Sequence, residues 1–227
     1  MPIETMVIIK PVLVAAGKKA IEKCKQKYRE YEDERIKTMF AYVGEELNLG
    51  ESTEAWDEFE KKIDDPQIHS AVVDAARKAV ESFDEAPIPY IAKVVAMITA
   101  KGSTSFDDRR LIRLLSDCDW QVIENLKHLS FILREVVFPE HAVEVTLKSE
   151  TTAEGRSLWI SPGPKVPAVA DRHDYITLFE ILKKNYWGRD SSAGGFGAAN
   201  GPHIMRISVE KLSVLRHLFA EHENTAD

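Results

Sequence analysis

The sequence predicts a mainly α-helical protein: an N-terminal helical bundle over residues 1–104, then a smaller α+β, winged-helix-like region over residues 105–227. Apolar residues recur at helical spacing up to about residue 138. Beyond that point Val143, Val145 and Leu147 alternate with polar residues, which is typical of a half-buried strand. The 227 residues are 44% hydrophobic and 30% charged, an ordinary globular composition with enough chain for a core.

The first predicted helix starts near Pro11 and carries an apolar stripe through Tyr28 and Tyr31. The step of five residues from Tyr31 to Ile36 breaks the helical phase. It indicates either one long helix with a stutter or two helices. The tyrosine stripe is wide enough to need a partner, so the sequence favours a homo-oligomer formed through the first helix. Gly50 marks the end of this helical segment.

Capping residues divide the next part of the chain into helices. Ser52 or Thr53 can cap one helix, and Asp65 followed by proline predicts a fresh start. The segment Tyr90–Lys101 is apolar on most faces, which predicts a central helix, and Gly102 marks its predicted end. Ser105 is the predicted cap of a short helix that ends near Leu115.

The remaining elements follow from periodicity and from breaker residues. A helix is predicted from Trp120 to about Val137, with Trp120, Ile123, Leu126 and Leu133 inward. The later elements are a hairpin with strands near Val143–Leu147 and Leu158–Ile160, a loop over Ser161–Val169, a helix over Tyr175–Trp187, a glycine-rich loop over Gly188–Pro202, a strand over Ile204–Val209 and a helix from Val209 to about His222.

Charge and cysteine content limit the class of protein. The net charge is −7, and the stretch from Glu45 to Asp65 accounts for it with nine acids and two lysines. Two cysteines without a CxxC spacing argue against a disulfide framework and favour a reducing cytoplasm. The apolar run Met6–Gly17 is too short for a membrane span and lacks the basic start of a signal peptide.

The acidic stretch is the first candidate binding surface. Trp56 and Phe59 lie within it beside Glu58, and an aromatic anchor ringed by carboxylates is a common form of protein interface. The alternative is a solvated helix whose two rings point into the core. Phe196, in the middle of the 188–202 loop, is a second candidate for docking on a partner.

The turn Ser116–Asp119 and its two flanking helices resemble a helix-turn-helix, and the following hairpin makes the arrangement similar to a winged helix. The resemblance implies that the second helix enters the major groove of DNA. Its candidate base-reading residues are Gln121, Asn125, Lys127 and His128, and the candidate phosphate contacts are Arg109, Arg110 and Arg113. Two observations argue against DNA binding. The predicted reading helix carries Glu124 beside only one lysine, and the three arginines lie on the helix before it.

No motif predicts an enzyme, a cofactor or a metal site. The loop Ser191–Gly197 lacks the lysine and hydroxyl of a phosphate-binding loop, and Asp171, His173 and Asp174 fit loop hydrogen bonding better than a metal site. Five lysines in residues 18–29 indicate a solubilising face. Glu144 with Lys148 lacks the spacing of a nuclease strand.

We therefore predict a non-catalytic interaction or regulatory protein of the bacterial cytoplasm that binds a protein partner. An adaptor in phage–bacterium conflict would suit a small acidic protein. The alternatives are a winged-helix DNA-binding regulator and an unrecognised hydrolase or nuclease.

Overall fold

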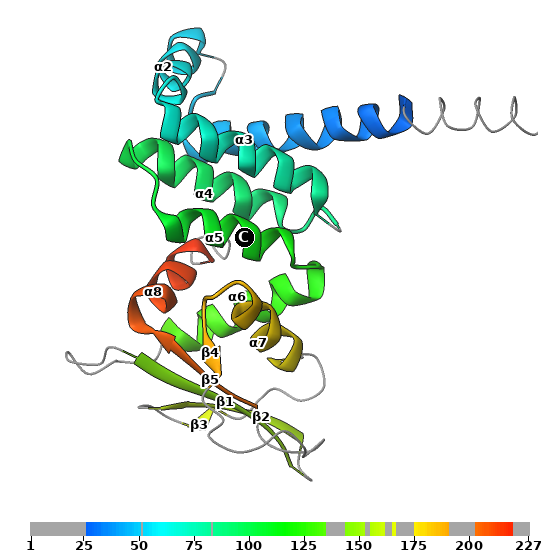
Figure 1. Cartoon of the computed structure of the whole chain (residues 1–227), viewed down its shortest axis with the longest axis vertical. Coiled ribbons are helices and arrows are strands. Elements are labelled where there is room, and N and C mark those ends of the chain that lie inside the picture. The colour runs from blue at the N-terminus through cyan, green and yellow to red at the C-terminus, as the bar shows by residue number, and fades with distance from the viewer. Residues whose placement is uncertain are drawn as a thin grey trace, which may run out of the picture.

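The computed structural model describes residues 26–50, 52–82, 84–134, 144–152, 155–161, 165–166, 175–190 and 203–219. Within these residues the protein is mainly helical, with a small antiparallel sheet (Figure 1). The elements in chain order are a first helix over 26–46, α2 (Thr53–Ile63), α3 (Pro66–Glu81), α4 (Ile88–Lys101), α5 (Phe106–Ser116), α6 (Trp120–Arg134), β1 (Glu144–Thr152), β2 (Gly155–Ser161), β3 (Lys165–Val166), α7 (Tyr175–Lys184), β4 (Arg189–Asp190), β5 (His203–Ser208) and α8 (Val209–Leu218).

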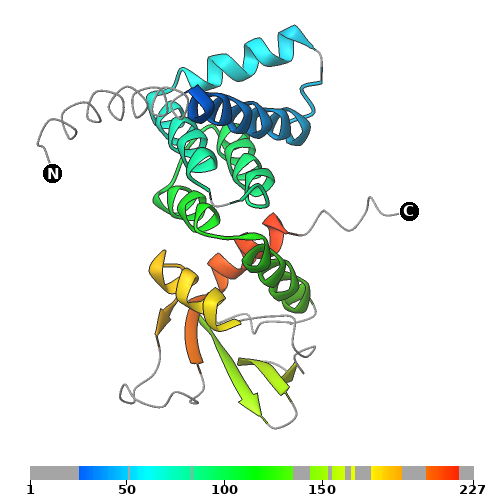
Figure 2. The same ribbon diagram turned by 90° about the vertical axis from the view of Figure 1, so that its right-hand side faces the viewer.

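Helices and sheet occupy opposite ends of the molecule (Figures 1 and 2). Helices α3, α4 and α5 pack against one another, while α6, α7 and α8 lie between them and the sheet. Helix α8 contacts both β5 and α4, so it joins the two ends, and the buried apolar residues form one continuous cluster. Because α5 packs on α3 and α4, contacts cross the predicted boundary at residue 104; the division into two domains stays a prediction.

The predicted helix ends are confirmed at three positions. The Asp65 carboxylate accepts hydrogen bonds from the backbone N–H groups of Gln67 (2.9 Å) and Ile68 (3.2 Å) at the start of α3. At Ser105 the side chain and that of Asp108 form a reciprocal capping box. Gly102 ends α4 with a φ of 69°, the left-handed conformation that glycine adopts without steric cost.

The described part of the first helix is continuous through the phase slip between Tyr31 and Ile36. Tyr28 and Tyr31 are 55% and 37% exposed, so the described part of the chain leaves this stripe largely uncovered. Burial begins one turn later with Arg35, which is only 5% exposed, and continues with Met39 and Val43. An arginine therefore occupies the position at which the apolar pattern slips.

Arg35 binds the end of α3. Its Nη1 lies 3.3 Å from the carbonyl oxygen of Ala79, 3.2 Å from that of Ser82 and 2.7 Å from that of Asp84. The last carbonyls of a helix have no partner within the helix, and their partial negative charge favours a cation. Since Nη1 carries two protons, one is shared between two oxygens. Arg35 thereby fixes the first helix to the turn between α3 and α4.

The sheet order is β3-β2-β1-β5-β4, and every neighbouring pair is antiparallel. The predicted hairpin is confirmed as β1 and β2, with Val145 and Leu147 fully buried on one face of β1. The predicted last strand is β5, which pairs with β1. Two short strands differ from expectation: β3 falls in the expected loop 161–169, and β4 falls in the expected loop 188–202. Both contribute only two residues, too few to produce an alternating pattern.

One inward prediction for α6 is wrong. Ile123, Leu126 and Leu133 are buried, but Trp120 is 63% exposed. A helical stripe predicts which face turns inward and not how far along the helix the neighbouring elements reach. The backbone N–H of Trp120 donates to the Asp84 carboxylate at 2.7 Å, so the start of α6 is anchored through its backbone.

Helix α7 ends in a Schellman turn whose left-handed position is a tyrosine. The N–H of Trp187 donates to the carbonyl of Leu182 (2.8 Å), and the N–H of Tyr186 donates to that of Lys183 (3.0 Å). Tyr186 has a φ of 60°, where glycine is the usual residue. Trp187 then turns into the core and is 2% exposed. The next residue, Gly188, lies against the buried Met205 of β5.

Candidate functional site

An open pocket of about 600 Å³ lies where the first helix meets α2. Asn48 and Gly50 adopt left-handed conformations (φ 53° and 55°) that reverse the chain, and Ser52 then caps α2. Trp56 Nε1 donates to the carbonyl of Gly50 at 3.2 Å, which fixes the indole at the pocket wall. The described residues that line the pocket are Ala41, Gly44, Glu45, Asn48, Gly50 and Trp56.

The indole of Trp56 is held rigidly. A Cβ at Gly44 would lie 2.8 Å from Trp56 Cζ2, so glycine is what lets the ring approach the first helix. The Phe59 ring packs edge-on to Trp56 with centroids 5.7 Å apart and edge-on to Phe40 with centroids 6.4 Å apart. A rigid aromatic wall is the kind of surface that loses little entropy on binding.

The three partner residues predicted on α2 have different positions. Trp56 is half-buried and lines the pocket, Phe59 is 4% exposed and supports it from the core, and Glu58 is exposed. Phe196 lies outside the described residues. Glu45 is exposed and also lines the pocket. The exposed acids on and beside α2 are Glu54, Asp57, Glu58, Glu60, Asp64 and Asp65.

The residues proposed to bind DNA do not share one exposed face. Arg113 and Gln121 are exposed, whereas Asn125 is 1% exposed and lies in the core. Lys127 pairs with Glu124 at 2.6 Å, and His128 contacts the hydroxyl of Tyr175. Helix α5 packs on α3 and α4, while α6 packs on α7 and α8.

Arg110 makes a contact that the sequence did not indicate. Its guanidinium lies between the rings of Phe106 and Tyr186, 4.1 and 5.0 Å from their centroids. Phe106 and Arg110 are one turn apart on α5, whereas Tyr186 comes from the turn after α7. Arg109, its neighbour on α5, is half-buried.

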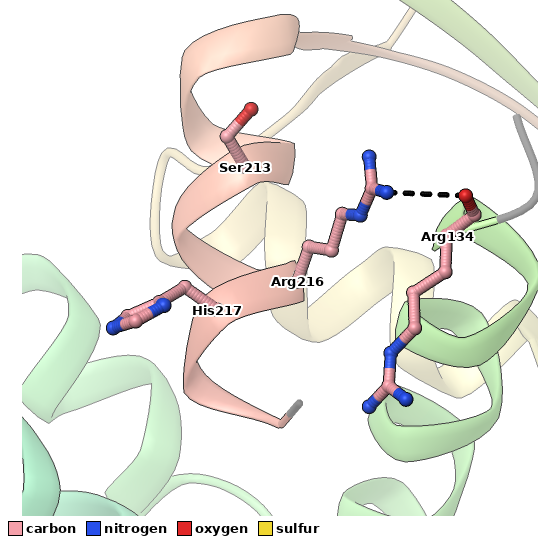
Figure 3. A pocket seen from close by; sticks show the side chains of 4 residues that line it. All are labelled: Arg134, Ser213, Arg216 and His217. Carbon is pink, nitrogen blue, oxygen red and sulfur yellow. Dashed lines mark hydrogen bonds between the residues drawn. The ribbon is translucent and has the colours of Figure 1, made fainter. Parts of the chain in front are cut away.

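A second pocket, of about 480 Å³, lies at the ends of α6 and α8 and is lined by Arg134, Ser213, Arg216 and His217 (Figure 3). Arg216 Nη2 donates to the carbonyl of Arg134 at 3.1 Å, and Arg134 Nη2 donates to that of Phe219 at 3.2 Å. Each arginine thus binds a carbonyl at the end of the other's helix. Figure 3 shows the two guanidinium groups and the imidazole pointing in different directions, so they do not converge on one ligand atom.

The groups suggested for catalysis or metal binding are placed as follows. Glu144 of β1 pairs with Arg189 of β4 at 2.6 Å, and Lys148 is half-buried on the same strand. Asp171, His173 and Asp174 lie outside the described residues. In the described ranges, no three His, Cys, Asp or Glu side chains gather as a metal site would require. Nor does any helix in those ranges have the length and apolarity needed to cross a membrane.

Cys118 is fully buried in the turn between α5 and α6. Burial, reinforced by the nearby Asp117, raises the pKa of its thiol far above the usual value, so the thiolate that reacts is suppressed. In a Cys24→Ser chain at pH 8, we expect Cys118 to react with an aromatic disulfide reagent at least about a hundredfold more slowly than in denaturant. Equal rates in the two conditions would contradict this burial.

Comparison of the chain with family models, with curated proteins and with solved structures found no match.

Proposed function

We propose that the protein is a non-catalytic interaction protein that binds a lysine- or arginine-rich segment of a protein partner in the Trp56 pocket. The observation that carries the proposal is an ordered indole wall beside the Glu45 carboxylate in an open pocket. An aromatic face and a carboxylate together recognise a cationic side chain, one through its π electrons and the other through its charge.

The surrounding charge supports the same class of partner. Six exposed acids of residues 54–65 lie on or beside α2 and would steer a basic segment toward the pocket. Lys61 and Lys62, in the last turn of α2, offset part of this charge. Phe59, beneath Trp56, provides stiffness to the site rather than a contact.

Several finer expectations stay proposals. Support for the bundle over residues 1–104 comes from the mutual packing of α3 and α4, and support for a winged-helix-like region comes from the hairpin that follows α6. The packing of α5 on α3 and α4 weighs against the winged helix. Pairing of two copies through the first helix draws support from the exposed Tyr28 and Tyr31. The proposed cytoplasmic location draws support from the two cysteines without a CxxC spacing, and the proposed adaptor role from the small size and acidity of the chain.

The test uses a short fluorescent peptide rich in lysine and arginine, with a counterpart in which glutamate replaces the basic residues. We expect anisotropy to report binding of the basic peptide alone, weakened by salt. Trp56→Ala should weaken binding about tenfold or more, in line with the loss of an aromatic anchor. Glu45→Gln, which removes no packing, should weaken it about threefold.

Trp120→Ala is the matched control, because Trp120 is an exposed tryptophan outside the pocket. It should leave the affinity unchanged. The proposal fails if both peptides bind alike, if neither binds, or if Trp120→Ala costs as much as Trp56→Ala.

A further inference from the structure

The two most exposed large apolar side chains in the described part of the chain lie together. Phe106 is 70% exposed and Tyr186 is 69% exposed, and the Arg110 guanidinium lies between their rings. Single exposed apolar residues are ordinary, but two rings assembled around one cation form a defined surface. We call Phe106, Arg110 and Tyr186 the ring–arginine stack.

The backbone of Tyr186 is strained where it presents this ring. A φ of 60° is unfavourable for a bulky residue, and glycine would occupy the position without cost. The fold does not need the Tyr186 ring, because Trp187 makes the buried contact that completes the Schellman turn. Strain held at an exposed side chain is a feature of binding sites.

Further cations lie beside Tyr186 and along α5. Lys184 and Arg189 flank Tyr186 in the chain and are 69% and 67% exposed at their side chains. Lys211 Nζ donates to the carbonyl of Tyr186 at 2.7 Å and lies 3.9 Å from Asp107. Arg113 is exposed one turn along α5 from Arg110.

Acidic partners neutralise these cations only in part. Arg110 pairs with Asp107 at 3.6 Å, Lys184 pairs with Asp117 at 3.0 Å, and Arg189 pairs with Glu144 at 2.6 Å. Exposed ion pairs of this kind contribute little to stability, so a phosphate can compete for the cations. The guanidinium of Arg110 lies over one face of each ring, and both side chains stay largely exposed.

We propose that the ring–arginine stack binds single-stranded nucleic acid, with bases stacked on Phe106 and Tyr186 and phosphates held by the surrounding cations. Exposed rings in a basic setting are the usual platform for unpaired bases, and duplexes keep their base faces hidden. A nucleic acid is favoured over a protein partner because four cations near the rings share only three acidic partners, and phosphates are the anions that such a surplus of positive charge attracts. The site is separate from the Trp56 pocket.

The test measures anisotropy of labelled oligothymidine and oligouridine of about 12 nucleotides, with a duplex of equal length, in about 50 and 200 mM NaCl. We expect both single strands to bind at least about tenfold more tightly than the duplex, and binding to weaken with salt. The variants are Phe106→Ser, Arg110→Gln and Tyr186→Gly. Each ring deletion should cost about tenfold in affinity.

Tyr186→Gly distinguishes binding from folding. It removes the ring and relieves the left-handed strain, so we expect a melting temperature equal to or above that of the unmodified protein together with weaker binding. Trp120→Ser is the control, since it removes a ring that is 63% exposed at the start of α6.

Three results would each overturn the proposal: no binding of either single strand at low salt, equal binding of duplex, or full affinity in both ring variants. The last would assign the binding to charge alone. If the ring variants instead weaken the basic-peptide complex, the stack belongs to a protein interface.

Discussion

Replacing Arg35 with leucine is expected to lower the free energy of unfolding by about 3 kcal/mol. The substitution leaves the carbonyls of Ala79, Ser82 and Asp84 without the donor that now serves all three, in a region where water has little access. Leucine also forgoes the favourable interaction of a cation with the end of a helix. Urea denaturation followed by circular dichroism measures the loss.

Arg77→Leu provides the control for this experiment. Arg77 is an arginine of α3 with a side chain 62% exposed, and its ion pairs are with acids on the same helix. Its replacement should change stability by no more than about 0.5 kcal/mol. The stability loss from Arg35→Lys should lie between those of Arg35→Leu and Arg77→Leu, because an ammonium keeps the charge but offers fewer hydrogen-bond donors than a guanidinium. Equal losses at positions 35 and 77 would show that Arg35 does not hold the end of α3.

Gly188→Ala is expected to lower the free energy of unfolding by about 2 kcal/mol. A Cβ at this position would lie 2.6 Å from Met205 Cγ and 3.3 Å from the backbone oxygen of Arg206. Met205 is fully buried on β5, so its side chain has little room to move away. The cost is steric, and it displaces either the methionine or the junction between α7 and β4.

Gly102→Ala separates this steric effect from backbone strain. Gly102 has a φ of 69°, and a Cβ at this position would have nothing within 4 Å, so alanine there should cost about 1 kcal/mol through conformation alone. Met205→Ala should relieve the cost at Gly188, so the double variant is more stable than the sum of the single losses. Strict additivity would contradict the contact.

The sequence was most informative where structure is local. Asp65, Ser105 and Gly102 have their capping roles because a cap depends on residues within one turn. The pairing of β1 with β2 was predictable because the two strands are neighbours in the chain, although both extend beyond the predicted ranges. The place of β5 beside β1 was not predictable, since pairing between distant strands leaves no mark at either strand alone.

The candidate sites were only partly predictable for the same reason. Trp56 was a candidate because aromatic and acidic residues share one short stretch, yet the sequence did not indicate that Gly44 makes room for its ring. Asn125 fitted a base-reading pattern, but the core buries it. Phe106 and Tyr186 come from distant segments, and only the packing of α5 near the turn after α7 brings them together.

The strand order also determines when the sheet can be completed during synthesis. Strand β1 forms its hairpin with β2 early, but its other neighbour, β5, leaves the ribosome only after α7 and β4. Until then the edge of β1 that β5 will occupy presents unpaired backbone groups. The nascent chain therefore has an unpaired, aggregation-prone strand edge between the synthesis of β2 and that of β5. The longer this interval lasts, the greater the exposure to aggregation.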